Sequence, residues 1–291
     1  MSRVFATGLV LPEGPVALPD GTWLVVEGGK RGCVTQISPD GLSRRTIATT
    51  GYPNGLAVDS KGAIWVAEAS TPGSLRRVTL DGSVEIFLSD CHGEPLLYPN
   101  DLCFGPDGDL YLTDSGISSE DFEPGGKVRS DFATCPMDGR VYRIDVKTRR
   151  IEKIDSGLRF TNGIAFGPDL DLYVNETITG AVYRYGRRTD GFGPREYFGN
   201  VLNDSPMSSL RGPDGMAFGS DGKLYVAVYG QGDVVVLGTD GKVADRLFTR
   251  GGLPTNVAFG LSGEKNLYVT EYELGQLEIF PVETTGLTLW T

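Results

Sequence analysis

The sequence predicts an all-β fold: a six-bladed β-propeller with four antiparallel strands in each blade. Two observations support this prediction. A unit made of a turn and two short apolar strands occurs six times in the 291 residues, at intervals of 41, 46, 62, 52 and 42 residues. Its second strand starts ten residues after a fixed polar position in units one to five, and eleven after it in unit six. A mostly β repeat of roughly 40 to 50 residues is typical of propeller blades. We therefore expect one propeller domain over residues 1–291.

The fifth unit, residues 212–232, shows the repeat most clearly. Asp221-Gly222 separates two apolar runs, and an Asp-Gly pair in that setting is a strong signal for a β-hairpin. The hairpin does not need Asp214, the polar residue in front of it. We call Asp214 and its counterparts the zero positions. In chain order they are Glu13, Asn54, Asn100, Asn162, Asp214 and Asn256.

The third and fourth strands of each blade follow the hairpin. Third strands are expected at Cys33–Ser38, Ser74–Thr79, Arg140–Asp145, Ala181–Gly186, Asp233–Gly238 and Gln276–Pro281. More polar fourth strands are expected at Ser43–Thr49, Ser83–Leu88, Arg149–Asp155, Arg195–Gly199 and Lys242–Phe248. Blade six has two candidates for its fourth strand, the N-terminal Arg3–Thr7 and the C-terminal Leu287–Trp290. We prefer the N-terminal strand because it joins the two ends of the chain and removes an open edge.

The interval of 62 residues contains an insertion, Ser115–Asp138, between the second and third strands of blade three. Strand direction places this loop on the same face as the zero positions. It is either a lid or an ornament, and long loops in compact domains favour the lid.

Composition limits the partners and the compartment. The net charge of −11 argues against a nucleic-acid partner. No run of about 18 apolar residues exists, so we expect no membrane partner and a cytoplasmic protein. The four cysteines share no CxxC spacing, which favours reduced thiols over disulfides or metal ligation. His92 is the only histidine and is interpreted as a loop residue.

All six zero positions carry side-chain oxygens. Turn propensity before a strand explains one or two such residues well and six poorly. Because the first strands of the blades line the central channel, the six side chains should converge on one mouth. A ring of oxygens with two carboxylates suits a hard divalent cation, Ca²⁺ first, with Mg²⁺ and Mn²⁺ as alternatives. Asp101, next to a zero position, is a further acid near the mouth. The acids fourteen residues after most zero positions are interpreted as structural.

The sequence resembles the senescence marker protein/gluconolactonase (regucalcin-like) family. The resemblance rests on PEGP at 12–15, PND at 99–101, NGIAFGPD at 162–169 and PDGMAFGSDGKLYVA at 213–227, and it covers nearly the whole chain. It implies lactone hydrolysis in a six-bladed propeller with one divalent metal. Its metal ligands fall on Glu13, Asn162 and Asp214, and Asp214 is also the implied proton acceptor. Asn100 matches a ligand of the related phosphotriesterase and paraoxonase propellers.

Two departures from related families limit this picture. Asn54 stands where paraoxonases carry a catalytic histidine, which argues against a histidine dyad. The arginine and asparagine that hold sugar hydroxyls in some members have no clear counterpart, so the lactone stays open.

The resulting hypothesis is a lactonase with Glu13, Asn100, Asn162 and Asp214 as metal ligands. Asp214, or alternatively Asp101, takes the proton from the attacking water. Asn54, Asn256 and Asn100 are assigned to substrate binding. The metal is one divalent ion, Ca²⁺ first, with Mn²⁺, Mg²⁺, Zn²⁺ and Fe²⁺ as alternatives. The partner is a small lactone, and the chain is a monomer or weak homo-oligomer. The alternatives are a phosphotriesterase on the same metal site and a non-catalytic NHL-like binding propeller.

Overall fold

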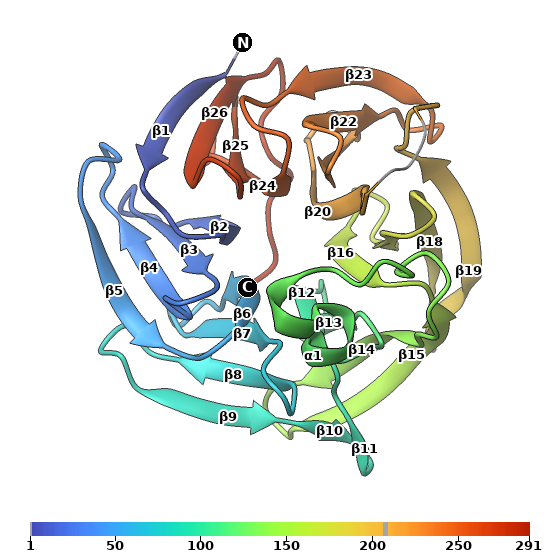
Figure 1. Cartoon of the computed structure of the whole chain (residues 1–291). Coiled ribbons are helices and arrows are strands. Elements are labelled where there is room, and N and C mark those ends of the chain that lie inside the picture. The colour runs from blue at the N-terminus through green and yellow to red at the C-terminus, as the bar shows by residue number, and fades with distance from the viewer. Residues whose placement is uncertain (1, 206–208) are drawn as a thin grey trace.

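The blades are arranged as a ring around a central channel (Figure 1). The computed structural model describes residues 2–205 and 209–291. Within these residues the strands form six four-stranded antiparallel sheets and one two-stranded sheet. Each four-stranded sheet is one blade, with its first strand innermost and its fourth strand on the rim. This confirms the predicted six-bladed propeller.

The strand bounds follow the predicted repeat closely. Blade one contains β2 (Pro12–Ala17), β3 (Trp23–Glu27), β4 (Cys33–Ile37) and β5 (Arg44–Thr49); blade two contains β6 (Pro53–Val58), β7 (Ile64–Glu68), β8 (Ser74–Val78) and β9 (Val84–Leu88). Blade three contains β12 (Pro99–Phe104), β13 (Leu110–Asp114), β14 (Gly139–Asp145) and β15 (Arg150–Leu158); blade four contains β16 (Thr161–Phe166), β17 (Leu172–Glu176), β18 (Ala181–Arg188) and β19 (Gly191–Asn200). Blade five contains β20 (Gly212–Phe218), β21 (Leu224–Tyr229), β22 (Asp233–Leu237) and β23 (Val243–Phe248). Blade six contains β24 (Pro254–Phe259), β25 (Asn266–Glu271) and β26 (Gln276–Pro281), and is completed by β1 (Arg3–Thr7).

The N-terminal strand closes the ring. Strand β1 pairs antiparallel with β26, with Arg3 opposite Ile279 and Thr7 opposite Gln276. Phe5 packs edge-on against Tyr268 of β25, with ring centroids 5.4 Å apart. The preferred closure is therefore confirmed, and the last edge of the ring is covered.

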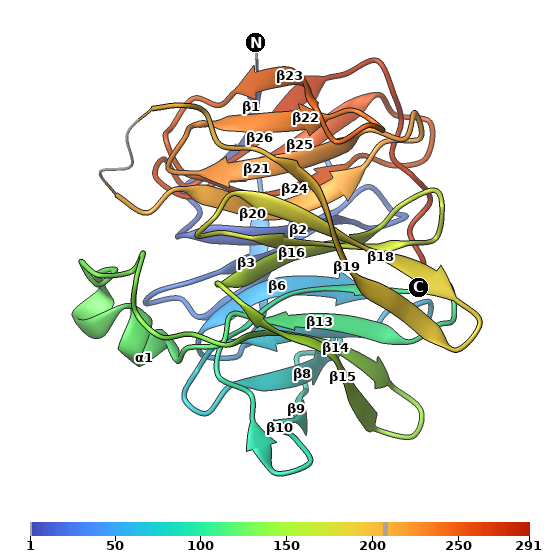
Figure 2. The same ribbon diagram turned by 90° about the vertical axis from the view of Figure 1, so that its right-hand side faces the viewer.

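The C-terminal tail, residues 282–291, takes a different course. It leaves blade six and hydrogen-bonds to the hairpin turn of blade five, where the Leu287 amide donates to the Phe218 carbonyl at 2.9 Å. An isolated bridge then joins Trp290 to Phe104 at the end of β12. The tail thus crosses the centre of the ring (Figure 1), and its end lies on the face opposite the helix α1 (Ser119–Phe122), as Figure 2 shows.

A bulge follows the start of every first strand. The pairing of the first two strands shifts register at this point in all six blades, for example between Glu13 and Val16 and between Pro99 and Leu102. A bulge places two consecutive residues opposite one and re-aims their side chains. This explains how a residue at a zero position and its neighbour, such as Asn100 and Asp101, both come to be buried at the channel.

The smaller elements were not predicted. They are α1, a 3₁₀ turn at Pro124–Gly126, and a hairpin of β10 (Asp90–Cys91) and β11 (Glu94–Pro95) that protrudes from the rim between blades two and three (Figure 1). His92 lies in the turn of this hairpin, as the loop interpretation expects. Of the helices in the described residues, none is long and apolar enough to cross a membrane.

Candidate active site and metal centre

A cavity of about 100 Å³ opens at one mouth of the channel. Five of the six zero positions line it, namely Glu13, Asn54, Asn100, Asn162 and Asp214. Apart from Asn54, which is half-buried, they are buried. The structure therefore brings together all four residues that we predicted as metal ligands. Asn256 and Asp101 are buried close to this group but are not among the residues that line the cavity.

The carboxylates at the base of the cavity repel one another. Burial, and then the charge of Asp101, raises the pKa of Glu13 to about 8. Burial, followed by the charges of Glu13 and Asp101, holds the pKa of Asp214 well above its usual range. Burial also raises the pKa of Asp101 to about 7. None of the three has an ion pair with Lys, Arg or His in the described chain. A cation beside these groups would favour their ionised form and lower their pKa.

Asn100 and Asn162 are each held by a hydrogen-bond relay of the same kind. The Asn100 amide nitrogen donates to Ser115 Oγ at 3.0 Å, and Ser115 donates to the Thr161 carbonyl at 2.9 Å. The Asn162 amide nitrogen donates to Thr177 Oγ1 at 3.3 Å, and Thr177 donates to the Pro213 carbonyl at 2.8 Å.

The relay determines which amide atom is free. Each hydroxyl has one proton and gives it to a backbone carbonyl of the next blade, so it can only accept from the asparagine. The amide nitrogen must therefore face the hydroxyl. The amide oxygen of Asn100 and Asn162 is then left to bind a cation or a ligand.

Asn256 and Asn54 differ from this pattern. The Asn256 amide nitrogen donates to Glu13 Oε2 at 3.1 Å, and its oxygen accepts from the Val257 amide at 2.8 Å. Both ends of the Asn256 amide are therefore occupied, and its contact with Glu13 orients that carboxylate. Asn54 lines the cavity, and its side chain forms no hydrogen bond with any other described residue, which leaves it free to contact a ligand.

The donor set fits a divalent cation. Asn162 Oδ1 is buried and has no hydrogen-bond partner within residues 2–205 and 209–291. It belongs to the same buried group as Glu13 and Asp214, and hard cations take carboxylate and amide oxygens. In the described part of the chain, no three His, Cys, Asp or Glu side chains form a cluster suited to a metal. A site here would therefore be mixed, with two carboxylates and neutral amide oxygens.

Aromatic side chains form the wall above this polar base. They are Tyr52, Tyr98, Phe122, Phe160, Tyr229 and Tyr272. Several are in contact, such as Phe122 and Phe160, whose ring centroids lie 4.4 Å apart. The sequence analysis missed this wall. The signal was present, because Leu11, Tyr52, Tyr98 and Phe160 each stand two residues before a zero position. Blades five and six have Gly212 and Pro254 there, which hid the pattern.

The insertion in blade three covers part of the cavity. Phe122 and Glu123 line it, and Tyr52 donates a hydrogen bond to Glu123 Oε2 at 2.8 Å. Phe122 is fully buried in an apolar cluster with Tyr98 and Phe160. The insertion thus packs over the zero positions, as a lid would. The lid function itself stays a prediction.

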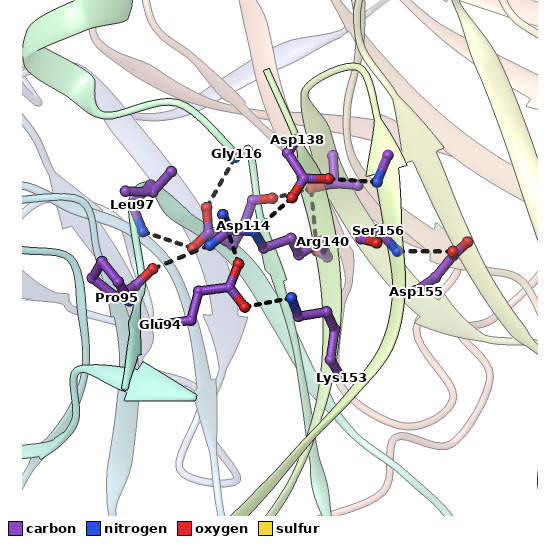
Figure 3. A network of polar contacts seen from close by, with 12 residues as sticks. Glu94, Pro95, Leu97, Asp114, Gly116, Asp138, Arg140, Lys153, Asp155 and Ser156 are labelled. Atoms are coloured by element: carbon purple, nitrogen blue, oxygen red, sulfur yellow. Dashed lines mark hydrogen bonds and ion pairs between the residues drawn. The ribbon is translucent and has the colours of Figure 1, made fainter. Parts of the chain in front are cut away.

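Both ends of the insertion are tied to blade three (Figure 3). The Gly116 amide donates to Asp114 Oδ1 at 2.9 Å, and the Arg140 guanidinium bonds Asp138 at 3.3 Å. Arg140 also donates to the Pro95 carbonyl at 3.1 Å and pairs with Glu94 at 3.1 Å. Both ends of the insertion are therefore fixed to the body of the propeller.

The acids fourteen residues after the zero positions have the structural role that we expected. Asp114 accepts from the Leu97 and Tyr98 amides at 2.7 and 3.0 Å. Glu27 accepts from the Val10 amide at 2.7 Å, and Glu176 from the Arg159 amide at 2.6 Å. These carboxylates hold the chain as it enters the first strand of the blade. They position the zero residues without facing the cavity.

Comparison with protein families decides where this fold and site belong. The model of the SMP-30/Gluconolactonase/LRE-like region matches residues 11–273. The chain belongs to this family. The match includes all six zero positions, so the repeat that led to the site is part of the SMP-30/gluconolactonase region itself.

Individual relatives agree with this assignment. The chain is 25% identical to a gluconolactonase of Zymomonas mobilis over 90% of this chain and 76% of that protein. It is 29% identical to the diisopropyl-fluorophosphatase of Loligo vulgaris over 81% of this chain and 74% of that protein. Among solved structures, a calcium-binding regucalcin of Agrobacterium tumefaciens superposes with a TM-score of 0.77 at 19% identity, over 100% of this chain and 96% of that one. The structural likeness supports the propeller fold.

Proposed function

We propose that this chain is a divalent-metal-dependent lactonase that opens the ester ring of a small lactone with water. One observation carries the proposal. Two buried carboxylates, Glu13 and Asp214, share the base of a cavity with the unpartnered amide oxygen of Asn162. Membership of the SMP-30/gluconolactonase family and the similarity to a gluconolactonase support ring hydrolysis as the reaction.

Glu13, Asn162 and Asp214 would hold the cation, with Asn100 as a fourth ligand. The formal charges of the two carboxylates equal the charge of one divalent ion, and the oxygen-only donor set favours Ca²⁺. When bound, the ion supplies a Lewis acid that stabilises the negative charge developing on the lactone carbonyl oxygen.

Asp214 is the proposed proton acceptor. Its carboxylate lines the cavity, whereas Asp101 does not and accepts a hydrogen bond from the Leu102 amide at 2.9 Å. Asp214 takes a proton from water as the water oxygen adds to the carbonyl carbon. The bond between that carbon and the ring oxygen then breaks, and the proton passes to the ring oxygen. The product is a hydroxy acid.

The other residues orient and enclose the substrate. The amide nitrogen of Asn54 would donate to a lactone oxygen, whereas the free oxygen of Asn100 would accept from a substrate hydroxyl when it does not bind the cation. Asn256, predicted to bind substrate, donates its amide nitrogen to Glu13, and this contact supports a role in orienting that carboxylate. The aromatic wall, which includes Phe122, would exclude bulk water from the reacting atoms.

The test begins with protein stripped of metal by a chelator. We expect no hydrolysis of γ- and δ-lactones until Ca²⁺, Mn²⁺, Mg²⁺, Zn²⁺ or Fe²⁺ is returned, and a rise in melting temperature with the same ion. Full lactonase activity in the stripped protein would refute the metal dependence. Absence of both metal binding and hydrolysis would favour the non-catalytic binding propeller instead.

The similarity to diisopropyl-fluorophosphatase supports one competing function, phosphotriester hydrolysis at the same site. The metal-loaded protein is therefore assayed in parallel with lactones and with diisopropyl fluorophosphate. We expect the larger kcat/KM with a lactone. A larger value with the organophosphate would reverse the assignment while leaving the metal site intact.

A further inference from the structure

The residues that line the cavity have an unbalanced charge. Three of them are acids: Glu13 and Asp214 at the base, and Glu123 in the covering insertion. Among the lining residues that the structure describes, none is Lys, Arg or His. Any charge that these lining side chains carry is therefore negative.

A bound divalent ion balances only part of this charge. It matches the two carboxylates at the base and leaves Glu123 uncompensated. Glu123 is half-buried, and burial raises the pKa of its carboxyl. Its one side-chain hydrogen bond within the described chain comes from the neutral hydroxyl of Tyr52 at 2.8 Å and favours the ionised form. Asp101, buried next to the base, is a further acid. In a site with low-dielectric aromatic walls, such charges act strongly on any ligand.

Two tyrosines of the wall have raised pKa values. Burial, followed by the charges of Asp214 and Glu123, raises the pKa of Tyr229 to about 12. The pKa of Tyr272 is raised as well, by burial and then by Glu123. Because the two rings contact each other at a centroid distance of 6.1 Å, the acids at the base and at the cover influence the same part of the wall.

We propose that the substrate of this site is an uncharged lactone, and that Glu123 discriminates against lactones carrying a negative substituent. This inference rests on the proposed lactonase function and specifies its substrate class. It also assigns a role to product charge. The ring-opened acid is an anion at neutral pH, so the same carboxylate that admits the neutral lactone favours release of its product.

The experiment uses two lactones that differ mainly in charge: γ-butyrolactone bearing a carboxamide on the ring carbon next to the ring oxygen, and the same ring bearing a carboxylate. The measured quantity is the ratio of kcat/KM for the carboxylate to that for the carboxamide, on metal-loaded protein. For the natural chain we expect a ratio of about 0.1 or less at low ionic strength. Raising the salt from about 0.02 M to about 0.5 M should raise this ratio by screening the repulsion.

Variants assign the effect to one side chain. Glu123→Gln keeps the size of the residue and its contact with Tyr52, and should raise the ratio about tenfold. Glu120→Gln is the matched control, because Glu120 is exposed on α1 and does not line the cavity; the ratio should not change. Tyr52→Phe removes the hydrogen bond to Glu123 but keeps the charge, so it too should leave the ratio low.

The outcomes separate this inference from the proposed function. Hydrolysis of the carboxamide lactone together with a ratio near 1, at low and high salt alike, overturns the charge selection and leaves the lactonase standing. An equal rise of the ratio in Glu120→Gln and Glu123→Gln would mean that overall charge is responsible, which also overturns the role of Glu123. Failure to hydrolyse either lactone, or any other tested, rejects the lactonase function itself. If Glu123→Gln does not fold, the salt dependence of the natural chain still decides whether charge selects the substrate.

Discussion

At the scale of single residues, the six zero positions occupy one place in the repeat but differ in what they contact. Asn100 and Asn162 turn an amide oxygen to the cavity, and Asn256 has both amide atoms occupied. The Asn54 side chain has no hydrogen-bond partner within residues 2–205 and 209–291. The repeat made it possible to predict where these side chains gather. It could not predict their hydrogen bonds, because Ser115 and Thr177 act through carbonyls of the next blade, a contact that exists only in the closed ring.

The first residue-scale prediction concerns Asp214. Asp214→Asn keeps an oxygen ligand of nearly the same shape but removes a charge and the proton acceptor. We expect kcat to fall by at least the ~10²-fold typical of a lost general base, with the loss persisting at saturating metal. Steady-state kinetics across a metal titration measure this. If excess metal restores most of the rate, Asp214 is only a ligand, and Asp101→Asn becomes the next variant to measure.

The second concerns the relay at Thr177. Thr177→Val keeps the volume but removes the hydroxyl, so the Asn162 amide loses the contact that fixes its orientation. We expect metal affinity to fall about 10- to 100-fold, the range seen when a group that orients a ligand is lost. Isothermal titration with Ca²⁺ measures the change without any turnover assay.

Thr177→Ser is the matched control for this relay, since it restores the hydroxyl and should restore binding to within about threefold. Equal affinities for the Val and Ser variants would show that the hydroxyl does not position Asn162. Such a result would leave the ligand assignment itself untouched.

At the scale of elements, the strands were predictable because each is short, apolar and bounded by turn residues at a fixed spacing. The long outer hairpin of blade four was underpredicted, since β19 begins at Gly191 and its first residues lack an apolar pattern. Helix α1 was missed for a related reason. Four residues are too few for a helical period, and tertiary burial of Phe122 holds them in place.

The insertion carries the element-scale prediction. Replacing all of residues 115–138 would also remove Ser115, which holds Asn100, and Asp138, which is bonded to Arg140. The change is therefore limited to residues 118–137, replaced by a short Gly-Ser linker. We expect Ca²⁺ affinity to stay within about threefold, because the base of the site keeps its contacts. The relative kcat/KM values for small and bulky lactones should change, because Phe122 and Glu123 are lost. Unchanged kinetics on every lactone tested would make the insertion an ornament.

At the scale of the whole molecule, ring closure depends on a pairing between residues far apart in the sequence. The β1–β26 pair joins residues 3–7 to residues 276–279. The preference for this closure came from the general cost of an open edge, and no local pattern in Arg3–Thr7 identified the partner strand. The sequence could therefore supply two candidates, while the choice between them depended on the assembled ring.

Deleting residues 1–8 tests how much the β1–β26 pairing contributes to the stability of the fold. The deletion exposes the edge of β26 and removes Phe5 and the buried Ala6 from the cluster around Tyr268. At ~2 kcal/mol for the loss of the Phe5 side chain and about 2–4 °C per kcal/mol, this contact alone should lower the melting temperature by about 4–8 °C, and the exposed edge of β26 should add to the loss. Calorimetry measures this. Deletion of residues 289–291, whose Leu289 is exposed, is the control and should have a smaller effect. If the control lowers the melting temperature by as much or more, the β1–β26 pairing has no special importance for stability.

The C-terminal tail crosses one end of the central channel. Its contacts with Phe218 and Phe104 carry it across the end of the ring opposite α1, away from the cavity. The cavity opens at the other end of the channel, beside Phe122 and Glu123 of the insertion. We expect the lactone to enter and the hydroxy acid to leave through this same opening. Bound product would therefore block the entry of the next substrate molecule. At saturating substrate, product release would then limit kcat.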